Sequence, residues 1–410
     1  METFDLKRGL FLGTSIGGVA SDGVFPGHPW EDWCRRNRPR EELPFRSADH
    51  WDRWHEDAEL MHGMGLECCR FVLDWAHIEP EQGCFDDAAI AHVREEILYL
   101  RAMGIRVTLV LHEFSDPVWF ARLGGWSKAA NIGLFLNYVE KILRTVGHLV
   151  EDYVPMSQPN LFAWNGWYSG AWMPGKKSML GVRQTMGVLA LTHIESYRRI
   201  HELRNELGLR DTRVGASVYM RMMRPAKKKA PLLSAGADTL ERLFQSAMGE
   251  AMVCGKFSVV ISNLGHVAKG SYCDFHDLCC YAVPVPMEVP GAGREPETDE
   301  LLYCAAERSA MLRRPICITE GSGLSAPSPR RIYDCVRALS AAGLPVERYF
   351  TLSFADGFGF GKGGETKLGI VTTVDNGKRK IRPAGEFLTR MIRNRGVTED
   401  MCRDYADTKM

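Results

Sequence analysis

Short apolar runs alternate with longer amphipathic segments along almost the whole chain, and this alternation restricts the fold more than any other feature. Short apolar runs bounded by turn residues indicate buried strands, and longer segments with apolar side chains at helical spacing indicate helices. Their regular alternation predicts parallel strands joined by crossover helices. Eight strands are predicted, at Leu10–Ser15, Cys68–Leu73, Val107–Leu111, Tyr153–Met156, Val214–Val218, Asp274–Cys279, Ile316–Thr319 and Tyr349–Ser353.

Helices are predicted between these strands, and Gly104, Gly208 and Gly343 follow three of them where a left-handed C-terminal cap is expected. The predicted helices are His50–Met64, Ala88–Met103, Asn131–Leu149, Val182–Leu207, Ala237–Val253, Thr298–Leu312 and Pro329–Ala342. The pattern predicts an α/β fold with a single (β/α)8 TIM barrel, and 410 residues fit one such domain over 1–410. Pro290–Glu297 lies between a strand and a helix, so we expect a surface loop there and no domain boundary.

Charge and apolar composition restrict the partners of the chain. Lys plus Arg and Asp plus Glu are both 51, so the overall charge does not attract nucleic acid or an anionic membrane. The basic run Lys227–Lys229 is interpreted as a solvated loop. No apolar stretch is long enough to span a bilayer. The expected partner is a small molecule, with neither nucleic acid nor membrane.

The twelve cysteines are scattered, with two adjacent pairs, Cys68/Cys69 and Cys279/Cys280, inside predicted strands. Adjacent strand residues face opposite sides, so these cysteines are interpreted as buried residues and not as a disulfide framework. No Cys-X-X-Cys spacing indicates zinc, and His112 has no second ligand at metal-binding spacing. The amino-terminal segment lacks the features of a signal peptide, so a cytoplasmic location is expected. No motif implies a metal or an organic cofactor.

Functional residues of a TIM barrel are expected where the strands end, because active sites of such barrels lie at the carboxyl face. The seventh strand ends in Thr319-Glu320-Gly321, and an acid after an apolar strand is expected to point into the mouth, where it can act as nucleophile or base. The fourth strand ends in Ser157-Gln158-Pro159-Asn160.

The two motifs in this order resemble glycoside hydrolase family 1, which carries Asn-Glu-Pro-Asn after the fourth strand and Thr-Glu-Asn-Gly after the seventh. The resemblance covers nearly the whole chain. Its further matches are Gly13-Thr14-Ser15, Cys69-Arg70-Phe71, Trp75, Pro80, Leu111-His112-Glu113-Phe114, Pro117, Trp119, Gly124-Gly125-Trp126, Asn165-Gly166, Gly170, Pro174-Gly175, Asp274-Phe275, Tyr281, Tyr349-Phe350, Ser353, Asp356, Phe358 and Leu368-Gly369-Ile370.

The resemblance implies catalytic roles for four residues. Glu320 matches the nucleophile, while Arg70 and Tyr281 match the residues that orient it; a guanidinium and a phenol keep a carboxylate ionised and in place. An Arg–Glu pair could also be a satisfied polar pair. Gln158 and Ser157 replace the family's acid/base Glu and the Asn before it. A carboxamide cannot transfer a proton, and that help is typically worth roughly 10²–10⁴ in rate.

Sugar-binding positions of the family are also changed. Its strand-1 Gln matches Ala20, its strand-3 His matches Glu113 (or His112 if the register slips by one), and its strand-8 Trp matches Leu352. The Glu and Trp that follow match Gly359 and Phe360. A glucose-type ring needs bidentate hydrogen bonds and an aromatic platform, so an ordinary glucosidase is not favoured. Lys362 and Lys367 do not fit the pattern of phosphosugar-binding members.

Substrate contacts are expected from residues at these positions and from the aromatic side chains that follow the fourth strand. These aromatic side chains could equally stack on a sugar or pack within the loop. The predicted substrate-binding residues are His112, Glu113, Ser157, Asn160, Trp126, Trp172, Leu352 and Phe360.

Three hypotheses remain open. The first is a retaining β-glycosidase-like or glycosyl-transferring enzyme for an unusual glycoside, with Glu320 as nucleophile and Gln158 positioning the aglycone or water. The second is a non-catalytic barrel that binds a glycan or small ligand. The third is a barrel with non-glycosidic chemistry in which Glu320 and Glu113 act as an acid/base pair.

Overall fold

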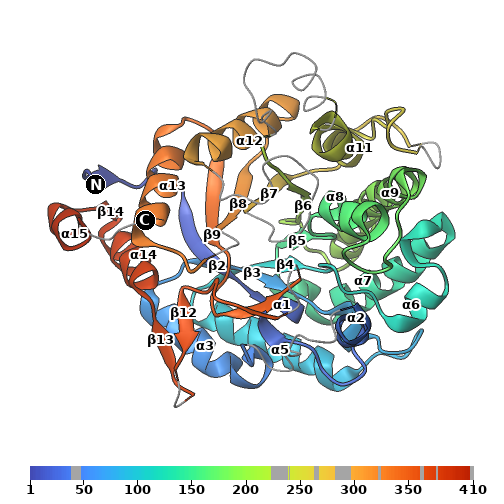
Figure 1. Ribbon diagram of the computed structural model, residues 1–410, viewed down its shortest axis with the longest axis horizontal. Helices are drawn as coiled ribbons and strands as arrows, with labels where there is room; N and C mark the ends of the chain where they lie inside the picture. The colour runs from blue at the N-terminus through green and yellow to red at the C-terminus, as the bar shows by residue number, and fades with distance from the viewer. Residues whose placement is uncertain are drawn as a thin grey trace.

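Eight parallel strands close into a barrel in the computed structural model, which describes residues 1–37, 48–222, 239, 241–262, 267–281, 297–321, 325–360, 364–374 and 377–406 (Figure 1). Each strand pairs with its neighbour in the chain, and the last pairs with the first. The predicted eight-stranded TIM barrel is therefore confirmed. The strands are β2 (Phe11–Gly17), β3 (Cys68–Val72), β4 (Arg106–Val110), β5 (Asp152–Val154), β6 (Arg213–Tyr219), β7 (Phe275–Tyr281), β8 (Ile316–Gly321) and β9 (Val346–Thr351).

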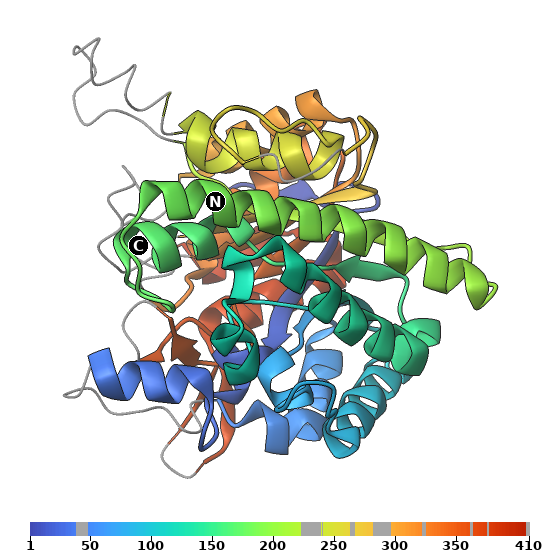
Figure 2. The ribbon, with the colours of Figure 1, turned by 90° about the vertical axis from the view of Figure 1, so that its right-hand side faces the viewer.

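Helices surround the barrel, and their bounds follow the predicted segments closely (Figures 1 and 2). They include α3 (His50–Met64), α5 (Asp87–Ala102), α7 (Ile132–Val146), α9 (Met179–Glu206), α11 (Ala247–Cys254), α12 (Thr298–Met311), α13 (Pro329–Ala341) and α14 (Pro383–Asn394). The predicted helix Ala237–Val253 is described only in part, as Thr239, Glu241, the π-helical turn Arg242–Ser246 and α11. Lys227–Lys229, Lys362 and the predicted loop Pro290–Glu297, apart from Glu297, lie outside the described residues.

Side chains alternate between the barrel interior and the layer beneath the helices, as the period of a strand requires. An interior apolar layer includes Val72 of β3, Val110 of β4, Cys317 of β8 and Phe350 of β9. The intervening residues, such as Ile318, pack outward into the large core shared with the helices. This alternation decides which polar residues face a ligand in the barrel mouth.

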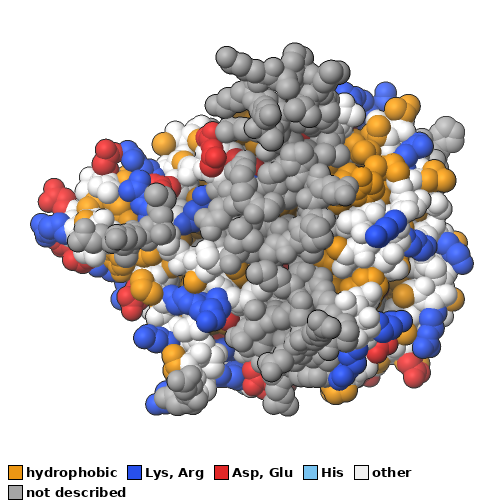
Figure 3. Space-filling view, in the orientation of Figure 1, with side chains coloured by type: hydrophobic (Ala, Val, Ile, Leu, Met, Phe, Trp, Pro, Cys, Tyr) orange, Lys and Arg blue, Asp and Glu red, His pale blue; other side chains and the backbone are white. Residues whose placement is uncertain are grey.

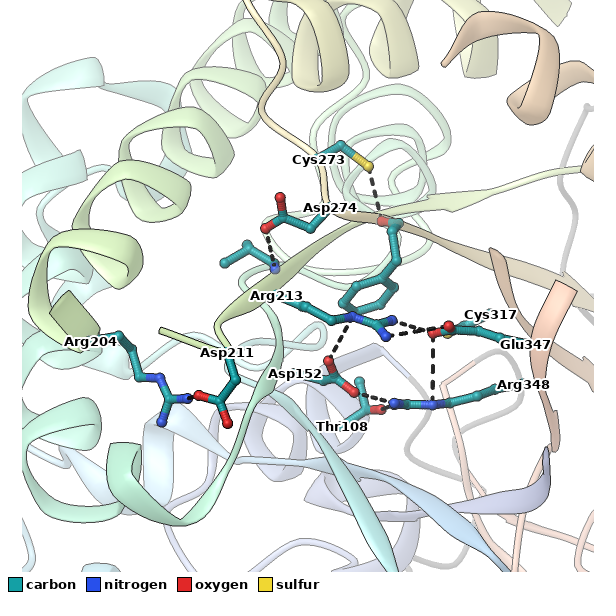
Figure 4. Close-up of polar contacts among 12 residues, drawn as sticks. Thr108, Asp152, Arg204, Asp211, Arg213, Cys273, Asp274, Cys317, Glu347 and Arg348 are labelled. Atoms are coloured by element: carbon teal, nitrogen blue, oxygen red, sulfur yellow. Dashed lines mark hydrogen bonds and ion pairs between the residues drawn. The ribbon is translucent and has the colours of Figure 1, made fainter. Parts of the chain in front are cut away.

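The amino-terminal end of the barrel is closed by a cluster of buried and half-buried ion pairs (Figure 4). Asp152 of β5 binds Arg348 of β9, and it also lies 3.1 Å from Nε of Arg213 on β6. Arg348 donates to Thr108 of β4 over 2.6 Å, and Arg213 binds Glu347. Side chains from five barrel positions thus meet at this end, so the opposite, carboxyl end is the one open to a ligand.

The carboxyl end faces the viewer in Figure 1 and carries short helices that follow the strands. These are α1 (Gly18–Asp22), α2 (Pro29–Asn37), α4 (Trp75–Ile78), α6 (Val118–Arg122) and α8 (Pro159–Trp164). In the space-filling view, apolar side chains gather over α8 and α9 on this face (Figure 3). In the part of the chain that the structure describes, no helix is both long and apolar enough to cross a membrane.

Candidate functional site

Arg70 is the centre of the barrel mouth. It lies on β3 and is 1% exposed. Its Nη1 donates to Glu113 Oε2 over 3.0 Å, and its Nη2 donates to Ser157 Oγ over 2.6 Å and to Asp277 Oδ2 over 3.4 Å. Burial lowers the pKa of the Arg70 guanidinium, but Asp277 and Glu113 more than offset this and raise it above its usual range. Arg70 is therefore a permanent cation between two carboxylates.

Gln158 and Tyr281 meet next to this cluster. The Tyr281 hydroxyl donates to Gln158 Oε1 over 2.5 Å, and Gln158 Nε2 donates to Ser157 Oγ over 3.2 Å. Burial holds the pKa of Tyr281 well above its usual range, so the phenol stays protonated. Gln158 has a φ of 48° in the left-handed region, a strained conformation that is common at functional sites. Hydrogen bonds therefore join Arg70, Ser157, Gln158 and Tyr281 into one cluster in the mouth.

Glu320 has a different environment from the one expected. Its Oε1 accepts from Nε of Arg331 on α13 over 2.7 Å, and its Oε2 accepts from the hydroxyl of Tyr349 over 2.7 Å. It is 2% exposed. The predictions that its carboxylate points into the mouth and that Arg70 and Tyr281 hold it are wrong for this structure.

The reason is the strand period. In β8, Cys317 packs in the interior apolar layer, while Ile316 and Ile318 pack into the outer core. Two residues beyond Ile318, Glu320 continues the outward series and meets α13. Burial disfavours the charge on Arg331, but Glu320 raises the pKa of its guanidinium above the usual range. The two form a buried ion pair between strand and helix.

The structure also shows which of His112 and Glu113, after the end of β4, faces the mouth. Glu113 reaches Arg70 in the mouth, with 11% of its side chain exposed. His112 is 1% exposed, contacts Asp116 over 2.8 Å and packs edge-on against the ring of Trp126. Glu113, and not His112, therefore reaches the mouth, and the position of His112 does not support the prediction that it contacts a substrate.

Asn160 and Trp126, which were also predicted to contact a substrate, form hydrogen bonds within the protein. Both amide atoms of Asn160 pair with the backbone of Tyr219, over 2.9 and 3.0 Å, and the residue is fully buried. Trp126 is also fully buried, and its indole donates to Asp116 over 2.7 Å. Asn160 anchors α8 to β6, and Trp126 belongs to the core, although it also lines a cavity beside the mouth.

Aromatic rings form a wall on one side of the mouth. Trp172 lies 4.7 Å from Phe114 and 5.8 Å from Phe360, measured between ring centroids. Trp30 of α2 lies 5.0 Å from Phe360, and its indole donates to the carbonyl of Phe114 over 2.8 Å. Phe114 has a φ of 59°. Leu352 is half-buried and lies against Gly321, at the end of β8. The predicted Trp172 and Phe360 therefore belong to one aromatic cluster.

A cavity of about 220 Å³ adjoins this wall between α2, α6 and the loop after α8. Its lining is mainly apolar, with charged side chains at Asp32, Arg36, Asp116 and Lys176. A mainly apolar lining with a few charged side chains is typical of small-molecule sites, but this volume is below their usual range of about 300–1,000 Å³.

Sequence reasoning missed Asp277, Arg331 and Tyr349. Asp277 sits in the middle of an apolar strand, two residues before Cys279, and a buried acid at that place was the available signal. Arg331 and Tyr349 carried no signal without knowledge of which face Glu320 takes. Among the described residues, no group of His, Cys, Asp or Glu side chains is arranged to hold a metal.

Comparison with known proteins gives the same family as the motifs. The sequence model for glycosyl hydrolase family 1 matches residues 17–274, more than half of the chain. The chain is 24% identical over 377 residues to a galactolipid galactosyltransferase of Arabidopsis thaliana, covering 85% of this chain and 58% of the relative. It is 23% identical over 425 residues to a beta-glucosidase-like protein of Oryza sativa, covering 93% of this chain and 60% of the relative.

This chain spans about three fifths of the length of those two relatives. Among solved structures, a beta-glycosidase from Pyrococcus horikoshii superposes with a TM-score of 0.83 at 21% identity, over 98% of each chain. That likeness extends the agreement in fold to the full barrel.

Proposed function

Because this chain belongs to glycosyl hydrolase family 1, we propose that its barrel mouth binds a glycosyl group without the two-carboxylate hydrolysis typical of the family. The observation that carries the proposal is the orientation of Glu320, whose two oxygens bind Arg331 and Tyr349 outside the barrel interior. A nucleophile must reach the reacting carbon, and this carboxylate faces a helix.

The position opposite the nucleophile supports the same proposal. Gln158 accepts from Tyr281 and donates to Ser157, so both ends of its carboxamide are held. It has no proton to give and no basic oxygen to activate water. Retaining hydrolysis needs two carboxyl groups about 5–5.5 Å apart. The mouth instead has Glu113 and Asp277 paired to one guanidinium.

The mouth retains groups that recognise a polar ring. Glu113 offers a carboxylate for ligand hydroxyls, and Tyr281, Ser157 and Gln158 supply further hydrogen-bonding groups beside it. Phe360, which is half-buried and packs against Phe114, the residue after Glu113, offers an apolar face. A ligand with hydroxyls on its edge and an apolar face fits this arrangement, which is the chemistry of a carbohydrate.

Binding is tested by calorimetry with a panel of glycosides, comparing two matched variants. Glu113→Gln should weaken binding about tenfold or more, because a charge-assisted hydrogen bond to the ligand is lost. Glu320→Gln should leave the affinity unchanged and lower the free energy of unfolding, because its carboxylate holds α13. Equal losses of affinity in the two variants would contradict the assignment.

A second candidate is glycosyl transfer through Glu320 as nucleophile. Its support is the position of Glu320 in the family motif and the name of one relative, a galactolipid galactosyltransferase. This reaction requires Glu320 to leave Arg331 and Tyr349 and turn into the mouth. The non-glycosidic alternative, with Glu320 and Glu113 as an acid/base pair, is not favoured, because the two carboxylates lie on opposite faces of the strand layer.

Covalent labelling separates the two candidates. Dinitrophenyl 2-deoxy-2-fluoro-glycosides need no general acid, so the neutral Gln158 cannot mask a working nucleophile. We expect no mass increase of the intact protein across a wide set of sugars. A stoichiometric adduct mapped to Glu320 would overturn the binding proposal and establish a retaining mechanism.

A further inference from the structure

A second cavity lies outside the barrel. It is lined by residues of α11, of the π-helical turn before it and of α12, and these helices neighbour each other in the ribbon views (Figures 1 and 2). Its volume is about 490 Å³, within the range of small-molecule sites. None of its lining residues contributes to the barrel mouth. The cavity is lined by Thr239, Glu241, Arg242, Ser246, Ala247, Glu250, Glu307, Arg308 and Met311.

The guanidinium of Arg308 is the buried cation of this cavity, and the residue is 1% exposed. Nε donates to Met220 Sδ over 3.0 Å, Nη1 to Met311 Sδ over 3.4 Å, and Nη2 to the Gln245 carbonyl over 3.0 Å. Thioether sulfurs are weak acceptors, and a guanidinium has five N–H groups. Burial lowers the pKa of Arg308. Within the described ranges, no carboxylate lies at ion-pair distance, so a buried cation and two of its N–H groups lack a strong partner.

Gly249 of α11 makes room for this guanidinium. A Cβ atom at that position would lie 1.6 Å from Arg308 Nη1, so any other residue would push the arginine out of place. Arg308 therefore packs directly against the backbone of α11. Its position is fixed by the fold.

The rim of the cavity carries the opposite charge. Glu241, Glu250 and Glu307 line it, against Arg242 and Arg308. Glu241 accepts from the Tyr303 hydroxyl over 2.5 Å, and Glu250 lies 3.3 Å from Lys256. Burial, and then the charge of Glu241, raise the pKa of Glu307. Three carboxylates and the Arg242 guanidinium thus line the cavity together with the buried cation.

We propose that this cavity binds a small zwitterion of the α-amino acid type, with its carboxylate on Arg308 and its ammonium among Glu241, Glu250 and Glu307. A simple anion would satisfy Arg308 but would be repelled by three carboxylates. A simple cation would satisfy the rim but would face a buried guanidinium. A molecule with both charges a few ångströms apart satisfies both.

The ligand class is tested by calorimetry with the twenty free L-amino acids. For each one that binds, the N-acetyl derivative and the methyl ester are the matched probes, because each removes one of the two charges. We expect the free amino acid to bind at least about tenfold more tightly than either derivative.

The site is tested with variants of its half-exposed rim, which leave Arg308 in place. Glu307→Gln and Glu250→Gln should each weaken binding of the free amino acid several-fold. Glu206→Gln, an exposed acid at the end of α9, is the matched control, and Glu113→Gln in the barrel mouth should also leave this affinity unchanged.

Two outcomes overturn the proposal. One is the absence of binding of all twenty amino acids up to about 10 mM, the range of the weakest specific ligands. The other is equal binding of the free amino acid and its N-acetyl derivative, which would make the site a simple anion site in which the acidic rim has no role.

Discussion

Arg70 organises the mouth at the scale of single residues. It bridges Glu113 and Asp277, two carboxylates from opposite sides of the barrel, and also donates to Ser157. Such a bridge must cross the interior, because β3 and β7 are not neighbouring strands. Without the guanidinium, two buried negative charges would face each other in a medium that screens them weakly.

Replacing Arg70 by Gln should therefore destabilise the fold by about 3–5 kcal/mol, the cost of leaving buried charges unpaired. The measurement is the free energy of unfolding from urea titrations. Arg101→Gln is the control, because its ion pair with Glu151 is exposed on both sides and should contribute less than about 1 kcal/mol. Similar losses in the two variants would show that Arg70 has no special structural role.

At the scale of secondary-structure elements, a second set of ion pairs connects strands of the barrel. The short strand β5 contributes Asp152, whose carboxylate binds Arg348 of β9 and Arg213 of β6 (Figure 4). Asp152 and Arg348 are 196 residues apart in the chain. They link the early and late strands of the barrel across its interior.

Arg348→Met should lower the free energy of unfolding by about 2–3 kcal/mol, because Asp152 loses one buried partner and keeps the other. Thermal and urea unfolding measure the effect. The comparison is Arg337→Met, whose pair with Glu2 is exposed and should cost less than about 1 kcal/mol. If the two variants unfold alike, the interior pairs do not hold the barrel end together.

The whole molecule carries buried histidines that make its stability depend on pH. Burial lowers the pKa of both His193 and His276 to about 4, and each imidazole donates one ring N–H to a backbone carbonyl oxygen, that of Tyr272 and that of Leu312. Below pH 6.5 the unfolded chain protonates these residues while the folded chain does not. Stability therefore falls as the pH decreases from 6.5 toward 4, by about 1.4 kcal/mol per pH unit for each histidine.

The free energy of unfolding should decrease by about 2 kcal/mol less between pH 6.5 and pH 5 in His193→Gln than in the unchanged protein. Urea titrations at the two pH values measure this difference. His148→Gln is the control, because His148 is exposed. His50 acts in the opposite sense: burial disfavours its charge, but Glu96 and Asp57 raise its pKa, so its contribution is lost only as the pH rises. An unchanged slope in His193→Gln would contradict the assignment of a buried neutral imidazole.

The sequence by itself determined the barrel and the neutral residue at Gln158. Strand and helix periods are local properties, so the eight strands and the helices between them can be read from nearby residues. Gln158 has a carboxamide whatever the fold, so the sequence alone shows that this side chain cannot transfer a proton. The motifs also placed Arg70 on a barrel strand, and Tyr281 and Ser157 at the ends of two others.

Only the tertiary structure decided which way the acids face. A shift of one residue turns a strand side chain to the other face, so the motif around Glu320 could not distinguish the mouth from α13. The same ambiguity applied to His112 and Glu113. The partners that settle it, Arg331 for Glu320 and Asp277 for Arg70, lie on other elements of the fold, and Asp277 is 207 residues from Arg70. Contacts at that separation exist only once the barrel has closed.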